Sequence, residues 1–232
     1  MSDLIERVKD LKHIPLFPLP LVLLPNELLP LHIFEPRYRQ MLKDIEGGGK
    51  VFGILLFDPE GTELIRPASG VVGCLAELRE STKLPDGASN ILTIGIARFR
   101  LIDYVDADEP YFVGDVEFFE DVEEAGEDLT ALADEVHALF ERIAKAAFLL
   151  SGSRGHFPEI PKTDPEQLSF LIATAFNLDN DLKYKMIEID STTERLTNLQ
   201  EILVHTVTKM EDSAHIHQVA QTNGHSDKKI KL

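Results

Sequence analysis

Residues 14–31 read IPLFPLPLVLLPNELLPL, an apolar segment that five prolines interrupt. Each proline removes an amide donor and biases the residue before it toward extended backbone, so no helix can form between them. A segment that is both apolar and extended has to be buried. Its leucines, together with Phe17 and Val22, are enough to begin a β core. The segment therefore predicts buried, extended chain at the start of the fold.

The next residues predict a short charged helix. Residues 32–42 read HIFEPRYRQML, and the apolar side chains of Tyr38, Met41, Leu42 and Ile45 recur at helical spacing. Charged residues occupy the positions between them. An extended proline-rich segment that leads directly into a charged helix is an unusual order.

Residues 50–119 have the pattern of β-strands. Runs rich in Val, Ile, Leu, Phe and Tyr alternate with Gly, Pro, Asp and Asn, and residues 84–90 predict a hairpin turn. Short strands at regular spacing predict an antiparallel sheet that is closed or half closed on itself. The expected strands are Val51–Phe57, Val71–Leu78, Ile91–Ile96, Phe99–Val105 and Tyr111–Phe119.

The spacing becomes helical after the acidic residues 123–128. An apolar stripe predicts a helix over 129–150, Asp164 with Pro165 predicts the start of a second, and a third, short helix is expected over about 181–189. Residues 191–194 form a capping box that opens the last helix. These helices predict a small antiparallel bundle, and the apolar content falls after it. We expect a β subdomain over 12–122, a helical bundle over 127–212 and a frayed tail over 213–232.

The order of these blocks resembles the N-terminal substrate-binding domain of the Lon protease family. The resemblance covers about residues 12–210 and is closest to stand-alone members, which lack the ATPase and protease domains. It implies an α+β fold, with a PUA-like β pseudo-barrel of about six strands and one helix before the small helical bundle. The matching blocks, in order, are residues 16–31, 33–38, 73–77, 84–95, 97–102 and 164–168.

Net charge limits the expected partners, and cysteine content indicates the cellular compartment. The formal net charge of −17 would repel phosphate backbones and anionic lipid, so neither nucleic acid nor membrane is an expected partner. A membrane span would need a helix through residues 14–31, which the prolines exclude. The single cysteine, Cys74, can form no intrachain disulfide. It predicts a buried core residue in a cytoplasmic protein.

No motif in the sequence predicts catalysis. Residues 47–50 imitate a phosphate-binding loop, but Asp44 and Val51 stand where that loop needs a glycine and a hydroxyl residue. Ser153 lacks the glycine that a nucleophile elbow needs two positions before its serine, because Ser151 stands there. The serine motif of Lon is absent, and the chain ends where its motor and proteolytic domains would begin. We therefore expect a non-enzyme with no cofactor.

Three histidines near the C-terminus are candidate metal ligands. His215 and His217 could clamp a metal ion if their segment were extended, and His205 lies close in sequence. Because no cysteine or ordered carboxylate completes such a site, we expect solvent-exposed histidines and no bound metal.

The start of the first helix is the candidate binding site, formed by Phe34, Glu35, Arg37, Tyr38 and Arg39. The resemblance implies that this loop and helix belong to the surface that meets unfolded polypeptide. Arginines beside exposed aromatic residues can stack on a peptide and donate hydrogen bonds to its carbonyl groups. In the structural alternative, Tyr38 packs on the sheet and the two arginines are merely solvated.

The resemblance implies a non-catalytic protein-recognition module, which binds unfolded polypeptides and either holds them or delivers them to a separate protease. Two other classes remain open. A small-molecule-binding module would need a compact pocket with converging polar groups. An RNA-binding module, suggested only by the PUA-like fold, would need a basic stripe, which the net charge of −17 argues against. The nearly heptad spacing of the last helix fits a monomer or a weak homodimer.

Overall fold

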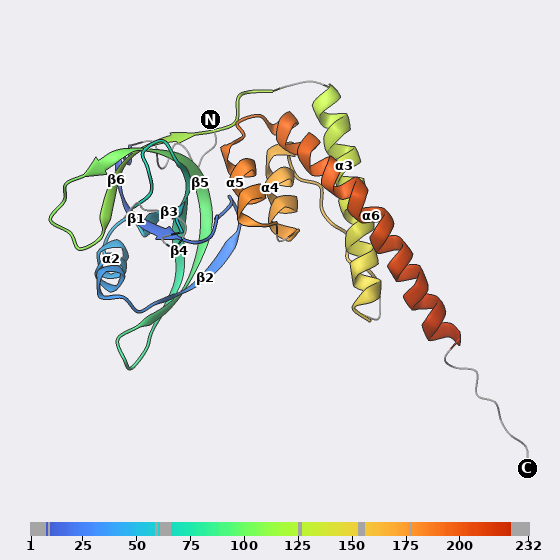
Figure 1. Cartoon of the computed structure of the whole chain (residues 1–232), viewed down its shortest axis with the longest axis horizontal. Coiled ribbons are helices and arrows are strands. Elements are labelled where there is room, and N and C mark those ends of the chain that lie inside the picture. The colour runs from blue at the N-terminus through green and yellow to red at the C-terminus, as the bar shows by residue number, and fades with distance from the viewer. Residues whose placement is uncertain are drawn as a thin grey trace, which may run out of the picture. The chain divides into compact units, whose positions relative to one another are not determined.

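The computed structural model describes residues 8, 10–58, 60, 66–124, 127–152, 156–176 and 178–223. Over these residues the protein is a mixed α+β fold with a six-stranded sheet and five helices (Figure 1). The elements, labelled as in the figure, are β1 (His13–Leu19), β2 (Leu28–Ile33), α2 (Pro36–Glu46), β3 (Val51–Leu56), β4 (Val72–Lys83), β5 (Ser89–Val105), β6 (Phe112–Phe119), α3 (Glu127–Leu150), α4 (Pro165–Ala175), α5 (Asn180–Glu188) and α6 (Thr192–Asn223).

The proline-rich segment forms two strands joined by a buried connection. β1 pairs in parallel with β3 and antiparallel with β6, and β2 pairs antiparallel with β5. Val22, Leu23 and Leu24 between the two strands are all buried. The prediction of buried, extended chain is confirmed.

The sheet closes on itself. The strand order is β2-β5-β4-β3-β1-β6, and β6 also pairs with β5, so the hydrogen-bonded ladders complete a ring. The 17 residues of β5 allow this, because its first part pairs with β2 and its last part with β6. The largest buried side chains of this core include Ile14, Leu16, Leu55, Leu75 and Phe99.

Three strand predictions were wrong in their bounds. Ile91–Ile96 and Phe99–Val105 form the single strand β5. A register shift leaves Ile96 without a partner on β4, and the pairing with β4 continues on both sides, at Gly95 and at Ala97. β4 runs on to Lys83, beyond the expected end at Leu78, because the hairpin partner continues to pair with it. The predicted turn between β4 and β5 is confirmed, with Leu84 N donating to Ala88 O at 2.8 Å.

The chain divides into two compact units: Met1–Val122 with Ala173–Asp190, and Glu123–Ile172 with Ser191–Leu232. The division differs from the expected boundaries at residues 173–190, which belong to the unit of the sheet. Long-range polar contacts explain the difference. Lys183 Nζ lies 2.6 Å from Glu27 Oε1, and Val72 N donates to the Tyr184 hydroxyl at 3.1 Å.

The regular secondary structure among the described residues of the second unit is helical. α3 and α6 pack against each other, and the Arg142 guanidinium makes two hydrogen bonds of 2.9 Å with the Glu211 carboxylate. Arg195 is fully buried, and its Nε donates to Ser169 Oγ at 2.7 Å. The predicted cap at Ser191 is confirmed, because Glu194 N donates to Ser191 Oγ at 3.0 Å.

α6 is longer than expected. It runs to Asn223, into the segment 213–232 that we expected to be frayed, because neither glycine nor proline interrupts it before Gly224. The backbone at His215 and His217 is therefore helical and not the extended segment that a metal clamp would need. Ser153 lies outside the described residues.

Cys74 is a core residue, as predicted. Its side chain is fully buried and forms no disulfide, and burial raises the pKa of the thiol to about 12. The thiol is therefore protonated at neutral pH, and a protonated, buried thiol is a poor nucleophile and metal ligand. None of the described helices combines the length and apolar character that crossing a membrane requires.

Candidate functional site

An apolar pocket of about 420 Å³ lies at one rim of the sheet. Strand directions bring its walls together, because β1 and β3 end side by side at Leu19 and Leu56, and β6 begins opposite Leu16. The start of α2 completes the rim. The lining residues are Phe17, Pro18, Leu19, Pro20, Leu31, His32, Ile33, Phe34, Glu35, Arg37, Tyr38, Phe57 and Phe112.

Two packed aromatic rings form the inner wall of the pocket. The rings of Phe17 and Tyr38 have centroids 4.0 Å apart, and the two residues are only 6% and 4% exposed. Burial raises the pKa of Tyr38, an effect that the nearby Arg37 charge opposes. Within the described part of the chain, the Tyr38 hydroxyl has no hydrogen-bond partner. Because Tyr38 lines the pocket, its hydroxyl is available to a ligand.

Phe34 is the exposed apolar residue at the mouth of the pocket. It is 58% exposed, although most phenylalanine side chains in proteins are buried. Its ring stacks on His32, with centroids 5.9 Å apart, and His32 Nδ1 lies 2.7 Å from Asn90 Oδ1. The stack holds Phe34 in place without burying it.

Glu35 and Arg37 form the charged part of the rim. Nε and Nη2 of Arg37 lie 3.0 and 2.9 Å from Glu35 Oε2, and both side chains are close to half exposed. The Arg37 guanidinium also lies 4.5 Å from the centroid of the Tyr38 ring. The pair is therefore ordered at the mouth of the pocket and accessible to a ligand, although an exposed pair of this kind adds little stability.

The sequence fixes this arrangement through the start of α2. Pro36 occupies the first turn, where its missing N–H is not needed, and the Glu35 carbonyl accepts from Tyr38 N and Arg39 N. The Glu35 side chain makes no capping hydrogen bond. It is therefore free to pair with Arg37, and the helix directs Tyr38 inward and Arg37 to the rim.

Four of the five predicted site residues line the pocket: Phe34, Glu35, Arg37 and Tyr38. Arg39 does not. Its Nη1 donates to the carbonyl of Asp86 at 3.4 Å, in the turn between β4 and β5. We therefore assign Arg39 to support of the hairpin and keep the other four as candidate binding residues.

Sequence reasoning missed the aromatic residues that three strand ends contribute. Phe17, Phe57 and Phe112 line the pocket, although their sequence pattern indicated only strand core. Phe17 gave no separate signal, because it lies inside the apolar segment 14–31. For Phe57 and Phe112 the available signal was their position at or next to the ends of the predicted strands. It becomes informative only when the strand directions place those ends at the same rim.

No metal-binding centre is found among the described residues. They contain no group of three or more His, Cys, Asp or Glu side chains that could hold a metal ion. His205 is exposed on α6.

Comparison with known families gives the chain its classification. The model of the family described as "ATP-dependent protease La (LON) substrate-binding domain" matches residues 13–205. The chain belongs to this LON substrate-binding domain family. The matched domain is the N-terminal substrate-binding domain and not the ATPase or protease domain of Lon.

Full-length Lon proteases are similar to this LON-family chain over part of their length. "Lon protease 2" of Herpetosiphon aurantiacus is 27% identical over 150 residues, which cover 65% of the chain and 18% of that protein. The Lon protease of Solibacter usitatus is 27% identical over 196 residues, covering 84% of the chain and 24% of that protein. The chain thus spans about a fifth to a quarter of the length of these relatives.

Solved structures show the same fold. A Lon N-terminal domain protein from Xanthomonas campestris matches with a TM-score of 0.58 and 24% identity, over 81% of this chain and 96% of that one. The N-terminal domain of a Mycobacterium avium complex Lon protease matches with a TM-score of 0.61 and 18% identity, over 83% and 98%. The mixed α+β architecture is therefore that of Lon N-terminal domains.

Proposed function

We propose that this LON-family chain is a non-catalytic recognition module that binds extended segments of unfolded polypeptides at the pocket beside α2. The observation that carries the proposal is an apolar pocket with the exposed Phe34 at its mouth, in a member of a substrate-binding domain family. Unfolded chains offer the apolar side chains that such a surface can bury. Arg37 and the Tyr38 hydroxyl can add hydrogen bonds to the bound backbone.

The same proposal includes a cellular role and an assignment for each unit. The module holds its polypeptides or delivers them to a separate protease in the cytoplasm, as a monomer or a weak homodimer. The first unit is a PUA-like β pseudo-barrel and the second a small helical bundle.

Replacing Phe34 by serine is expected to weaken binding of an unfolded polypeptide about tenfold. A loss of this size is typical when an aromatic contact residue is removed, and tenfold corresponds to about 1.4 kcal/mol. The measurement is fluorescence anisotropy of a labelled, permanently unfolded polypeptide titrated with the protein.

Two matched variants serve as controls. Ile102→Ser removes another exposed apolar side chain of the same unit, 45% exposed, and Arg39→Ala removes an arginine that does not line the pocket. Both should bind like the unchanged protein. Absence of saturable binding at tens of micromolar, or an equal loss in Ile102→Ser, would contradict the proposal.

A small-molecule-binding function is the second candidate. The observation in its favour is the pocket volume of about 420 Å³, which lies within the range of about 300–1,000 Å³ found for small-ligand sites. A thermal-shift screen with metabolites tests it. A compound that stabilises the unchanged protein but not Phe34→Ser would favour this function if unfolded polypeptides fail to bind.

A further inference from the structure

A second pocket adjoins the first. It has a volume of about 410 Å³, and Phe112 lines both pockets. It is built from the end of β5, the connection to β6 and the start of β6, a part of the chain that lies beside α2 (Figure 1). Its lining residues are Arg66, Tyr104, Val105, Asp106, Ala107, Glu109, Tyr111, Phe112 and Val113.

Hydrogen bonds hold the walls of the second pocket in place. The Tyr111 hydroxyl donates to Asp44 Oδ2 on α2 at 3.0 Å, and the Tyr104 hydroxyl donates to the Pro67 carbonyl at 2.8 Å. Burial raises the pKa of Tyr111, and the Asp44 hydrogen bond and the charges of Asp44 and Glu109 raise it further. The second pocket is therefore preformed next to the apolar one.

The lining of the second pocket is acidic. Asp106 and Glu109 are exposed, and neither carboxylate forms an ion pair with another described residue. Arg66 is the cation among the described lining residues, and its guanidinium lies over the Tyr104 ring, 3.9 Å from the centroid. The described lining thus contains two carboxylates and one guanidinium, in a protein of net charge −17. Both the pocket and the overall field favour a cationic ligand.

We infer that the two pockets together recognise polypeptide segments in which an aromatic or aliphatic residue lies close to lysine or arginine. The apolar side chain enters the first pocket, and the basic side chain reaches Asp106 and Glu109 in the second. This inference rests on the proposed function and names the class of segment that the site prefers. Charge complementarity carries it, because the apolar pocket alone does not distinguish basic from acidic neighbours.

The test uses three labelled peptides with the same aromatic anchor, flanked by lysine, by serine or by glutamate. At low ionic strength the lysine-flanked peptide should bind about 3- to 10-fold more tightly than the serine-flanked one, and the glutamate-flanked peptide should bind most weakly. The preference should fall at high salt, because the carboxylates are exposed. In the double variant Asp106→Asn, Glu109→Gln, the lysine and serine peptides should bind within about twofold of each other.

A matched double variant separates local from overall charge. Glu80→Gln, Glu117→Gln removes two exposed carboxylates of the same unit that line neither pocket, and it should keep the preference for lysine. Equal binding of the three peptides, preference for glutamate, or equal loss of preference in both double variants would overturn the inference and leave the proposed function standing. Failure of every peptide to bind would overturn both.

Discussion

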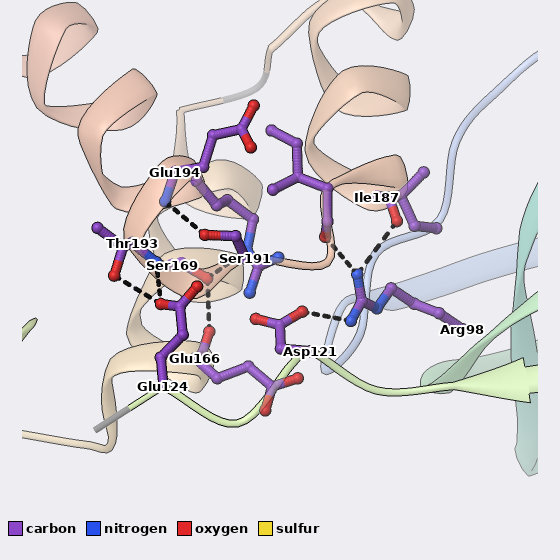
Figure 2. Close-up of polar contacts among 11 residues, drawn as sticks. Arg98, Asp121, Glu124, Glu166, Ser169, Ile187, Ser191, Thr193 and Glu194 are labelled. Carbon is purple, nitrogen blue, oxygen red and sulfur yellow. Dashed lines mark hydrogen bonds and ion pairs between the residues drawn. The ribbon is translucent and has the colours of Figure 1, made fainter.

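Replacing Arg98 by methionine is expected to lower the free energy of unfolding by about 3–5 kcal/mol, the usual result of breaking a buried ion pair. Arg98 is 3% exposed, and its guanidinium donates to the Asp121 carboxylate and to the carbonyl oxygens of Ile187, at 3.3 Å, and Ile189, at 2.6 Å (Figure 2). It also lies over the Phe119 ring. The variant removes the cation that faces a buried carboxylate and the donor to two carbonyl groups.

Urea denaturation followed by circular dichroism measures this loss. Arg100→Met is the control. Arg100 lies on the same strand but is exposed, and among the described residues its guanidinium donates only to the Gly70 carbonyl. Amide exchange should also accelerate in α5 of the Arg98 variant, because Arg98 attaches the end of α5 to the sheet. Equal losses in the two variants would contradict this role for Arg98.

Replacing Gly95 by alanine is expected to destabilise the first unit by about 3 kcal/mol, at the upper end for an overpacked site. A Cβ atom at this position would lie 2.2 Å from the Leu24 carbonyl oxygen and 2.9 Å from Cys74 Sγ. The nearest atom belongs to the backbone, which hydrogen bonds hold in place: Gly95 N donates to Glu27 O, and Asn26 N donates to Gly95 O. Relief of the clash would therefore disrupt the buried connection between β1 and β2.

Gly49→Ala is the matched control for this variant. The nearest atom to a Cβ at Gly49 is Val51 Cγ2 at 3.6 Å, which is ordinary van der Waals contact. Its free energy of unfolding should change by no more than about 0.5 kcal/mol. The same urea titration compares the two variants, and a Gly95→Ala protein as stable as Gly49→Ala would show that the Leu24 connection can move freely.

Sequence signals predicted the features that depend on neighbouring residues, such as extended backbone and helix starts. Prolines excluded helix from residues 14–31, and the caps at Asp164 and Ser191 marked helix starts that the structure confirms. The strand spacing predicted a closed or half-closed sheet, but the pairings that close it were not predictable. Closure depends on the bulge at Ile96, which keeps β5 continuous, and on pairings between distant strands. The position of α5 likewise depends on partners far away in sequence, such as Lys183 with Glu27.

The candidate site shows the same division between local and long-range information. The helix start supplied Phe34, Glu35, Arg37 and Tyr38, because charge and aromatic residues gather within a few positions there. The opposite wall comes from three separate strand ends, so it required the strand directions. Arg39 was included because it is next to the other candidates in the sequence. Its side chain instead reaches the neighbouring hairpin.

Site-specific photocrosslinking tests most directly whether the pocket beside α2 contacts unfolded polypeptide. A benzophenone amino acid is placed at position 34 in one protein and at position 102, another exposed apolar position of the same unit, in a second. The expected result is a saturable crosslink to an unfolded polypeptide from position 34, which excess unlabelled polypeptide removes, with little from position 102. Equal crosslinking from both positions, or none from position 34, would contradict the proposed binding site.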